Sequence, residues 1–517
     1  MLLLGDILRR HARYRPDKVA YVIDDDRVTY AEFDTRANRL GHVLAAHGVG
    51  RCDRVAILAH NCVDYPVAYF AAARLGAILV PVNTRLRPAE VRYVLAQSES
   101  ETLLYGPEFR ELVGESTREL PTLRRRFALD DADDGAPVLR ELLARAASTT
   151  QPMSAVHEDD PHVMLYTSGT TGDPKGALCS HRSYVLQAAQ TQAANGLGED
   201  DIGVSMFPMF HMGGWALPLG FWYNGGTVVL MRRADPDALL AAIARERATY
   251  FYGVPTVYAR MLEVPNFGRY DITSLRAIGG GTAAMSEALV QAISERFRAA
   301  SLSIVYGSTE AGPVSQLRRR DLFRKPTSVG RPVLNVDVRL VAPDGRQCQP
   351  GETGEVTVRS EFVMRGYWRL PEATAETIRD GWVHTGDLAV VDEDGFLHIA
   401  GRIKEVIKSG GENVYPAEIE RALHEHPKIR EAAVVGVPDP EWTEAPLAAI
   451  VLHPGATMTE AEVLAYLRER LASFKKPRHV RFLESLPRTA STRQVQKTIL
   501  REILAVTAPP VPDPASR

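Results

Sequence analysis

The chain has 517 residues, which is more than one hydrophobic core usually organises, so we expect two or more domains. Its 61 lysine and arginine residues are nearly balanced by 64 acidic residues, and no long run of one sign occurs, which argues against a nucleic-acid or anionic-membrane surface. Four scattered cysteines and the lack of an apolar stretch of roughly 18 residues argue against a disulfide framework, a zinc site and a transmembrane segment, and predict a soluble cytoplasmic protein.

The first 80 residues alternate between helical and strand patterns. Thr29 and Glu32 have the spacing of a capping box, which predicts a helix over 30–47. Short apolar runs at 55–58 and 78–82 flank a further helical stretch through Leu75. The same alternation recurs at 162–166, 182–195, 227–231, 237–246, 249–252, 284–299 and 303–306. This pattern predicts an α/β fold with layered, largely parallel sheets.

A run of hydroxyl-bearing and glycine residues, 166–176, follows one of these apolar stretches. The glycines let backbone N–H groups approach an anion, the hydroxyls add donors, and the lysine adds a positive charge. Pro174 prevents a direct entry into a helix, so the loop differs from a Walker loop. The run predicts a nucleoside triphosphate site, and a polar surface turn is the alternative. Its candidate residues are Thr167, Ser168, Gly169, Thr170, Thr171, Gly172 and Lys175.

Two further motifs follow apolar runs where strands are expected to end. Gly279, Gly280 and Gly281 suggest that a flat group such as adenine lies against bare backbone, with a flexible connector as the alternative. The second motif is Tyr306-Gly307-Ser-Thr309-Glu310. Its tyrosine could stack on a base, its threonine could bind a phosphate, and its glutamate could hold Mg²⁺. A polar turn is the alternative for this motif.

From about residue 330 to 401 the pattern changes to short alternating strands with turn signals, which predicts a β-rich subdomain. Within it, Asp387 could accept both ribose hydroxyls and Arg402 could brace the sugar or a phosphate, although both residues could equally be surface ion-pair partners. From Lys404 onward, helical and strand patterns predict a compact α+β unit. Residues 506–517 lack apolar spacing and are expected to form a loose tail.

Four motifs occur in order: Thr-Ser-Gly-Thr-Thr-Gly-Asp-Pro-Lys-Gly, Tyr-Gly-Ser-Thr-Glu, His-Thr-Gly-Asp and Gly-Arg-Ile-Lys-Glu. Together they resemble the adenylate-forming superfamily of acyl-CoA synthetases, nonribosomal adenylation domains and luciferases, over about residues 8–505. The resemblance implies a large N-terminal adenylation domain, 1–403, a hinge at Lys404 and a small mobile lid domain, 404–505. It also implies an AMP-forming acid–thiol ligase that uses ATP, Mg²⁺ and CoA on a small carboxylic acid, and it is compatible with a homodimer.

The resemblance also implies an acyl pocket and a CoA channel. The predicted pocket residues are Phe207, His211, Trp215, Tyr252, Gly253 and Gly281. Trp215 stands where related long-chain fatty acyl-CoA synthetases carry a gating tryptophan, which favours an apolar or aromatic acid, with a core tryptophan as the alternative. His211 could point at the carboxylate, and a histidine bound to backbone is the alternative. Gly410 and Gly411 would line the CoA channel after the lid rotates, and a tight turn is the alternative.

The segment 486–497 departs from the family pattern, which places a lysine there to bridge the acyl carboxylate and the ATP phosphate. Without a gap, Arg493 takes that position and keeps the positive charge, although a guanidinium is not equivalent to an ammonium. With a shifted register Gln494 takes it and the charge is lost. Lys497 could reach the site only if the loop moves.

Three functions therefore remain open at this point. The leading one is an acyl-CoA ligase for an apolar or aromatic acid. The second keeps adenylation but changes the acid or the acceptor, either by loading a carrier protein or by activating nitrite with ATP to diazotise an aryl amine. The third is a non-catalytic nucleotide-binding relative.

Overall fold

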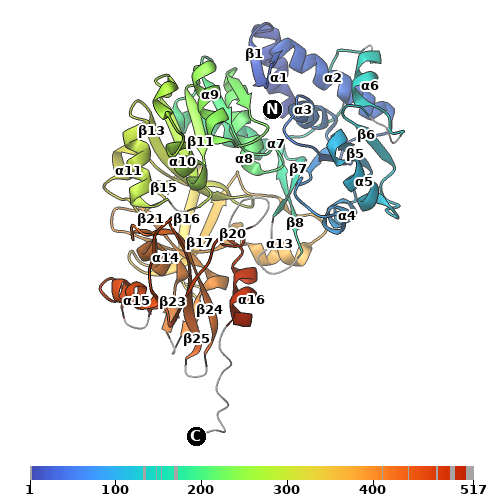
Figure 1. Cartoon of the computed structure of the whole chain (residues 1–517). Helices are drawn as coiled ribbons and strands as arrows, with labels where there is room; N and C mark the ends of the chain where they lie inside the picture. Colours follow the sequence, from blue (N-terminus) through green and yellow to red (C-terminus); the bar gives the residue numbers. More distant parts are fainter. Residues whose placement is uncertain are drawn as a thin grey trace.

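The computed structural model describes residues 3–131, 135–146, 148–152, 154–167, 173–283, 285–409, 412–439, 442–472, 475–488 and 495–507. Within these residues the strands form four sheets (Figure 1). The mixed α/β fold expected from the sequence is confirmed, because the two largest sheets have mainly parallel strands and are joined by helices.

The first sheet has the strand order β18-β8-β7-β4-β3-β5-β6. The pairs among β3, β4, β5, β6 and β7 are parallel, whereas β8 and β18 add antiparallel strands at one edge. The strands are β3 (Arg54–Leu58), β4 (Ile78–Pro81), β5 (Thr102–Tyr105), β6 (Arg125–Ala128), β7 (Pro161–Thr167), β8 (Lys175–Ser180) and β18 (Gly366–Tyr367). The helices of this part of the chain are α2 (Tyr30–Ala46), α3 (Asp64–Leu75), α4 (Pro88–Gln97), α5 (Arg110–Thr117) and α6 (Leu139–Arg145).

The second sheet has the strand order β15-β14-β13-β12-β11-β9-β10-β1-β2, and only its outer strands β2, β14 and β15 pair in antiparallel fashion. Its strands are β1 (Val19–Ile23), β2 (Asp26–Thr29), β9 (Ile202–Ser205), β10 (Thr227–Leu230), β11 (Tyr250–Gly253), β12 (Ala277–Gly281), β13 (Ser301–Ser308), β14 (Gly312–Leu317) and β15 (Arg331–Pro332). The accompanying helices are α1 (Leu4–Tyr14), α7 (His181–Asn195), α8 (Met212–Asn224), α9 (Pro236–Arg245), α10 (Pro255–Leu262), α11 (Glu287–Arg296) and α12 (Arg319–Leu322).

The third and fourth sheets follow in the last part of the chain. The third is antiparallel and contains β16 (Val336–Val341), β17 (Thr353–Ser360), β19 (Ile378–Arg379), β20 (Trp382–Val391) and β21 (Leu397–Arg402), with α13 (Pro371–Thr377) beside it. The fourth contains β22 (Ile407–Ser409), β23 (Glu412–Val414), β24 (Ile429–Asp439), β25 (Thr443–Leu452) and β26 (His479–Phe482), with α14 (Pro416–His424), α15 (Glu460–Arg468) and α16 (Lys497–Thr507). Figure 1 shows the fourth sheet and its helices, coloured orange to red, at one end of the molecule.

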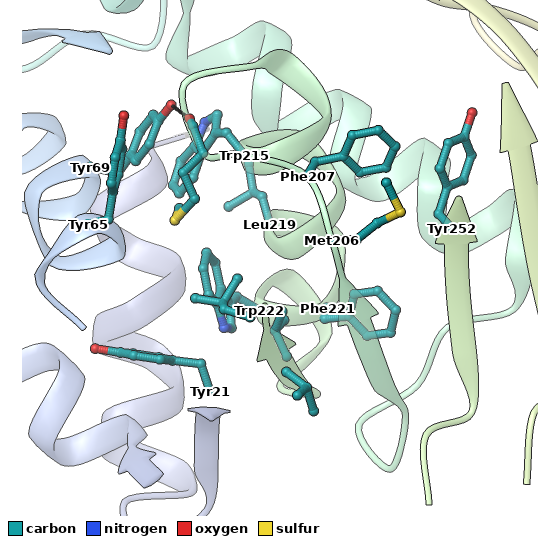
Figure 2. Close-up of a cluster of buried hydrophobic side chains, with 14 of the residues drawn as sticks. Tyr21, Tyr65, Tyr69, Met206, Phe207, Trp215, Leu219, Phe221, Trp222 and Tyr252 are labelled. Atoms are coloured by element: carbon teal, nitrogen blue, oxygen red, sulfur yellow. Dashed lines mark hydrogen bonds between the residues drawn. The ribbon is translucent and has the colours of Figure 1, made fainter. Parts of the chain in front are cut away.

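One large core joins the first two sheets. Helix α8 buries residues on several of its faces, because its sequence is apolar nearly all round, and Trp222 packs edge-on against Tyr21, Phe33 and Phe70. Figure 2 shows Trp222 among the other large side chains of this core. The fourth sheet has separate cores made only of residues beyond position 406. Burial is therefore organised independently on the two sides of the segment 403–406.

Local sequence signals predicted some element boundaries correctly and others wrongly. The predicted helix over 30–47 is α2, and Thr29 and Glu32 form the expected capping box at its start. The predicted strand end before Gly279 is wrong, because all three glycines belong to β12. The predicted tail begins too early as well, since α16 continues to Thr507, and residues 508–517 lie outside the described residues.

Candidate active site

The candidate phosphate loop connects two paired strands. Thr167 ends β7 and Lys175 begins β8, and the two residues lie opposite each other in the antiparallel ladder. The loop that they enclose contains Ser168, Gly169, Thr170, Thr171 and Gly172, which lie outside the described residues. The Lys175 ammonium lies 5.2 Å from the centre of the Tyr367 ring, so its charge is close to β18 at the start of β8.

Glu310 lies in the turn after β13, and it contacts the same tyrosine. The Tyr367 hydroxyl donates a hydrogen bond of 3.0 Å to Glu310 Oε1. Burial and the Glu310 charge raise the pKa of Tyr367 well above its ordinary value, so its hydroxyl stays protonated and remains a donor. The sequence analysis did not identify Tyr367, because a lone tyrosine on a two-residue strand carries no local signal.

Tyr306, Asp387 and Arg402 come together at the junction of the second and third sheets. The Tyr306 hydroxyl donates to Asp387 Oδ2 at 2.7 Å, and Arg402 Nε donates to Asp387 Oδ1 at 3.0 Å. Asp387 and Arg402 face each other across β20 and β21, and Gly386, with a φ of 72°, provides the left-handed residue just before the aspartate. Burial raises the pKa of Asp387, and its two partners oppose that shift.

The other residues of the Tyr306 motif line the turn between β13 and β14. Gly307 lies opposite Pro313 at an irregularity in the ladder, and a Cβ there would be 2.3 Å from Gly312 O, so the backbones approach too closely for a side chain. Gly307 is exposed and Thr309 is half-buried, so neither is part of the core.

The predicted acyl residues Phe207 and Tyr252 lie together, with ring centres 5.7 Å apart. The loop that carries Phe207 is held by two buried side chains from the first half of the chain. Asn61 donates to Phe207 O at 3.0 Å and accepts from Met209 N at 2.8 Å, and Tyr69 donates to Met209 O at 2.7 Å. Asn61 and Tyr69 were missed in the sequence analysis, because their partners are more than 130 positions away.

The glycines of β12 accommodate side chains of the protein itself. A Cβ at Gly279 would lie 2.3 Å from Tyr252 Cδ2, and one at Gly281 would lie 2.1 Å from Tyr252 Oη. A Cβ at Gly280, on the opposite face, would lie 2.6 Å from Met285 Sδ. The flat group against this backbone is therefore the Tyr252 ring rather than a space open for adenine, and the glycines are strand residues rather than a flexible connector.

Two further predicted acyl residues are close in sequence to the aromatic pair: Gly253 follows Tyr252, and His211 lies four residues after Phe207. A Cβ at Gly253 would meet the Tyr258 and Phe251 rings at 2.9 and 3.0 Å, so the lack of a side chain there again serves internal packing. His211 is half-buried at the N-terminal end of α8, and its ring centre lies 4.5 Å from that of Phe210.

Trp215 lies in the core rather than beside the Phe207–Tyr252 pair. Its side chain has no exposed surface, and its ring stacks on Tyr69 with centres 4.0 Å apart and an angle of 5° between the planes. Figure 2 shows Trp215 next to Tyr69, on the other side of the view from Tyr252. This placement favours the core alternative over a gate.

Lys497 is held by two carboxylates of the C-terminal domain. Its ammonium lies 2.8 Å from Glu405 Oε2 and 2.8 Å from Glu420 Oε1. Burial works against the charge of Lys497, but the two carboxylates outweigh it and raise the pKa. The lysine is therefore engaged next to Lys404, and it is not free to replace the missing family lysine. Arg493, Gly410 and Gly411 lie outside the described residues.

A metal site made only of protein ligands is absent from the described part of the chain, where no group of three or more histidine, cysteine, aspartate or glutamate side chains could hold an ion. A single carboxylate such as Glu310, completed by phosphate oxygens and water, nevertheless fits the way Mg²⁺ is usually bound. In the same described residues, no helix is both long and apolar enough to cross a membrane.

The fold has a large N-terminal domain and a small C-terminal domain, and the candidate site residues are of the kinds that bind a nucleotide. A sequence model of the AMP-binding enzyme family matches residues 8–368, and one of the AMP-binding enzyme C-terminal domain matches residues 418–493. The chain belongs to the AMP-binding enzyme family. It is an AMP-forming acid–CoA ligase, which uses ATP and CoA as substrates, and this contradicts the alternative of a non-catalytic relative.

Three similar proteins illustrate the relationship. Feruloyl-CoA synthase from an Amycolatopsis species is 38% identical over 504 residues, which covers 96% of this chain and 98% of the relative. Long-chain-fatty-acid–CoA ligase FadD13 from Mycobacterium tuberculosis is 35% identical over 513 residues, which covers 98% and 99%. The crystal structure of the anthranilate CoA ligase AuaEII with anthranoyl-AMP has a TM-score of 0.90 and 30% identity, and the match covers 98% of each chain.

Proposed function

We propose that the acid activated by this enzyme is aromatic, and that its ring lies against Phe207 and Tyr252. The observation that carries the proposal is the aromatic pair itself, whose ring centres are 5.7 Å apart. Tyr252 lies near the carboxyl end of β11, next to Gly279 of β12, and β12 in turn pairs with β13, which carries Tyr306. Because the carboxyl ends of parallel strands share one edge of a sheet, the aromatic pair and the nucleotide residues face the same region.

Three sets of residues would hold the phosphates, the ribose and the base of the nucleotide. Thr167, Lys175 and the enclosed loop would bind the phosphates, and the Asp387–Arg402 pair would bind the ribose. Thr309 would add a phosphate contact, with Tyr306 beside the base. Mg²⁺ held by Glu310 would supply charge neutralisation on the phosphate oxygens.

The chemistry follows from the leaving group. A carboxylate resists attack by a thiol because its oxygen leaves poorly, and transfer of AMP to that oxygen makes it a good leaving group. Lys175 would offset negative charge on the triphosphate as pyrophosphate departs, and a positioned cation of this kind stabilises the transferring group. His211, at the start of α8, would face the acid carboxylate.

The rotation of the lid would take place within two residues. Before Lys404, Arg402 is paired with Asp387 of the large domain at 3.0 Å, and after it Glu405 is paired with Lys497 of the lid at 2.8 Å. Only Ile403 and Lys404 lie between these two anchored positions, and Ile403 is 44% exposed, so it can move without opening a core. We therefore assign the hinge to this pair of residues, with residues 1–403 and 404–505 as the two bodies.

The cation that bridges the acyl carboxylate and ATP would be Arg493. Lys497 is already bound by two carboxylates, so we favour Arg493, the other positively charged candidate in this segment, which lies outside the described residues. Its guanidinium has a different shape and hydration from the usual lysine. Gly410 and Gly411 stay predicted residues of the CoA channel.

A comparison of acids tests the proposal. Pyrophosphate release and thioester formation would be measured with ferulate, indoleacetate and anthranilate, and with saturated fatty acids of increasing length. We expect the highest kcat/KM for an aromatic acid, and a Tyr252→Ala variant should lose more kcat/KM with that acid than with a short aliphatic one. A clear preference for long-chain fatty acids, unchanged by Tyr252→Ala, would refute the aromatic pocket.

A further inference from the structure

Tyr367 lies between two side chains of opposite charge. The Lys175 ammonium is 5.2 Å from the centre of its ring, and its hydroxyl donates a 3.0 Å hydrogen bond to Glu310. One aromatic side chain therefore contacts the two residues to which the proposed function assigns the triphosphate and the metal ion.

The backbone around Tyr367 fixes this position from both sides. Tyr367 pairs with Ala177 of β8, and the next residue, Trp368, donates its N–H to Gly176 O at 2.8 Å, so the segment is joined to the strand that begins with Lys175. On the other side, Met364 donates its N–H to Glu310 O at 2.8 Å. The segment 364–368 thus links the strand of the lysine to the turn of the glutamate.

The direction of the ring is also held locally. The Thr374 hydroxyl accepts a hydrogen bond of 2.9 Å from the Tyr367 N–H, and the same hydroxyl donates to Leu370 O at 2.8 Å. Tyr367 is half-buried, so part of the residue remains accessible.

A lysine and a glutamate this close to one aromatic ring would ordinarily attract each other. Such an ion pair contributes little stability by itself, but while it is formed each member is less available for another charged partner. An aromatic face attracts an ammonium without neutralising it, and a hydroxyl binds a carboxylate while leaving its second oxygen available. The ring and the hydroxyl of a tyrosine therefore suit a spacer between two charges that must bind different parts of one ligand.

We propose that Tyr367 is a positioning residue that keeps Lys175 and Glu310 apart and orients them toward the triphosphate and its divalent cation. This inference rests on the proposed function of those two charged residues. Without the spacer, the lysine and the glutamate would form an ion pair that MgATP would have to break.

Two substitutions separate the roles of the hydroxyl and the ring. Tyr367→Phe keeps the spacer and removes the hydrogen bond to Glu310, so the Mg²⁺ concentration for half-maximal ATP binding should rise by roughly 10- to 100-fold, the usual contribution of one hydrogen bond to a charged group. Tyr367→Leu removes the aromatic face as well, so the requirement for Mg²⁺ should rise further, and the affinity for ATP at saturating Mg²⁺ should also fall. In the double variant Tyr367→Leu with Lys175→Met, the requirement for Mg²⁺ should return toward that of Tyr367→Phe, because Glu310 no longer has a partner to pair with.

A second tyrosine provides a matched control. The Tyr270 hydroxyl donates to Asp237 Oδ1 at 2.7 Å, and the Arg269 guanidinium lies 4.7 Å from its ring centre. Arg269 also pairs directly with Asp237 at 2.8 Å, so this tyrosine binds a carboxylate on a different part of the surface without separating it from the cation. Tyr270→Phe should leave both the Mg²⁺ dependence and the ATP affinity unchanged. Thermal unfolding of each variant would show whether it is folded.

Calorimetric titration with ATP at a series of Mg²⁺ concentrations measures these quantities without any acid substrate. Wild-type protein that binds no MgATP would refute the proposed function together with this inference. Wild-type binding with an unchanged Mg²⁺ dependence in Tyr367→Phe and Tyr367→Leu would refute the inference alone. Equal effects of the phenylalanine and leucine variants would also refute it, because the ring would then have no role as a spacer.

Discussion

Alanine substitutions at two adjacent glycines of β12 distinguish internal packing from nucleotide contact. A Cβ at Gly279 would lie 2.3 Å from Tyr252 Cδ2, whereas ordinary contacts are 3.4–4 Å. The ring would therefore have to move by roughly 1 Å, and overpacking of this kind costs about 1–3 kcal/mol of stability. At Gly280 the nearest atom is Met285 Sδ at 2.6 Å, and a flexible methionine can move aside more easily than a ring.

The displaced ring also connects the substitution to activity. Tyr252 contacts Phe207, so a shift of its ring reaches the proposed acid pocket, where misplacement by about 1 Å can cost up to 10²-fold in rate. We expect Gly279→Ala to lower the free energy of unfolding and to raise KM for the acid, with little change in KM for ATP. Gly280→Ala should show smaller effects on both the stability and the KM for the acid.

Urea unfolding and steady-state kinetics with each substrate varied in turn would measure these effects. The reasoning fails if Gly280→Ala is as damaging as Gly279→Ala. It also fails if Gly279→Ala raises KM for ATP while KM for the acid stays unchanged, because the glycine would then contact the nucleotide.

Three further predictions concern the hinge, the core and acid stability. Glu405→Gln should slow both half-reactions by about 5- to 30-fold, because the segment after Lys404 would no longer be fixed to the proposed lid. Glu418→Gln, which removes the 2.7 Å ion pair to Lys475, should leave both rates unchanged. Equal rates for the Glu405→Gln and Glu418→Gln variants in stopped-flow assays would contradict this. Trp215→Phe should lower the free energy of unfolding by about 1–3 kcal/mol without changing KM for the acid, and a changed KM would restore the gate interpretation. Burial lowers the pKa of His181 to about 4, so the folded protein keeps this histidine neutral while the unfolded chain protonates it below pH 6.5. The free energy of unfolding should therefore fall by roughly 3 kcal/mol through this residue as the pH drops from above 6.5 to about 4. His181→Gln should therefore weaken the dependence of unfolding free energy on pH by up to one proton, and an unchanged slope in urea titrations at pH 7.5, 6 and 5 would contradict the buried neutral histidine.

The sequence was sufficient where a signal is local or belongs to a family motif. Thr29 and Glu32 form the predicted capping box in the structure, because the bonds involve residues three positions apart. Asp387 and Arg402 were predicted as separate ligands of the nucleotide, and this role stays a prediction; the structure shows that they lie opposite each other on β20 and β21.

The sequence was not sufficient where a role depends on distant partners. Gly279 and Gly281 suggested a flat ligand, but the register between β11 and β12 shows that Tyr252 occupies that face. Lys497 looked available for catalysis until its position between Glu405 and Glu420 was known. Tyr367 had no recognisable signal, since its contacts come from residues 57 and 192 positions away in the chain.

The most direct test of the mechanism separates the two half-reactions. Enzyme incubated with ATP, Mg²⁺ and an aromatic acid, but without CoA, should release one pyrophosphate per active site and retain an acyl adenylate that mass spectrometry can identify. Addition of CoA should then convert that adenylate into a thioester and AMP. Thioester formation without prior release of pyrophosphate, or no release of pyrophosphate with any aromatic acid, would contradict the account.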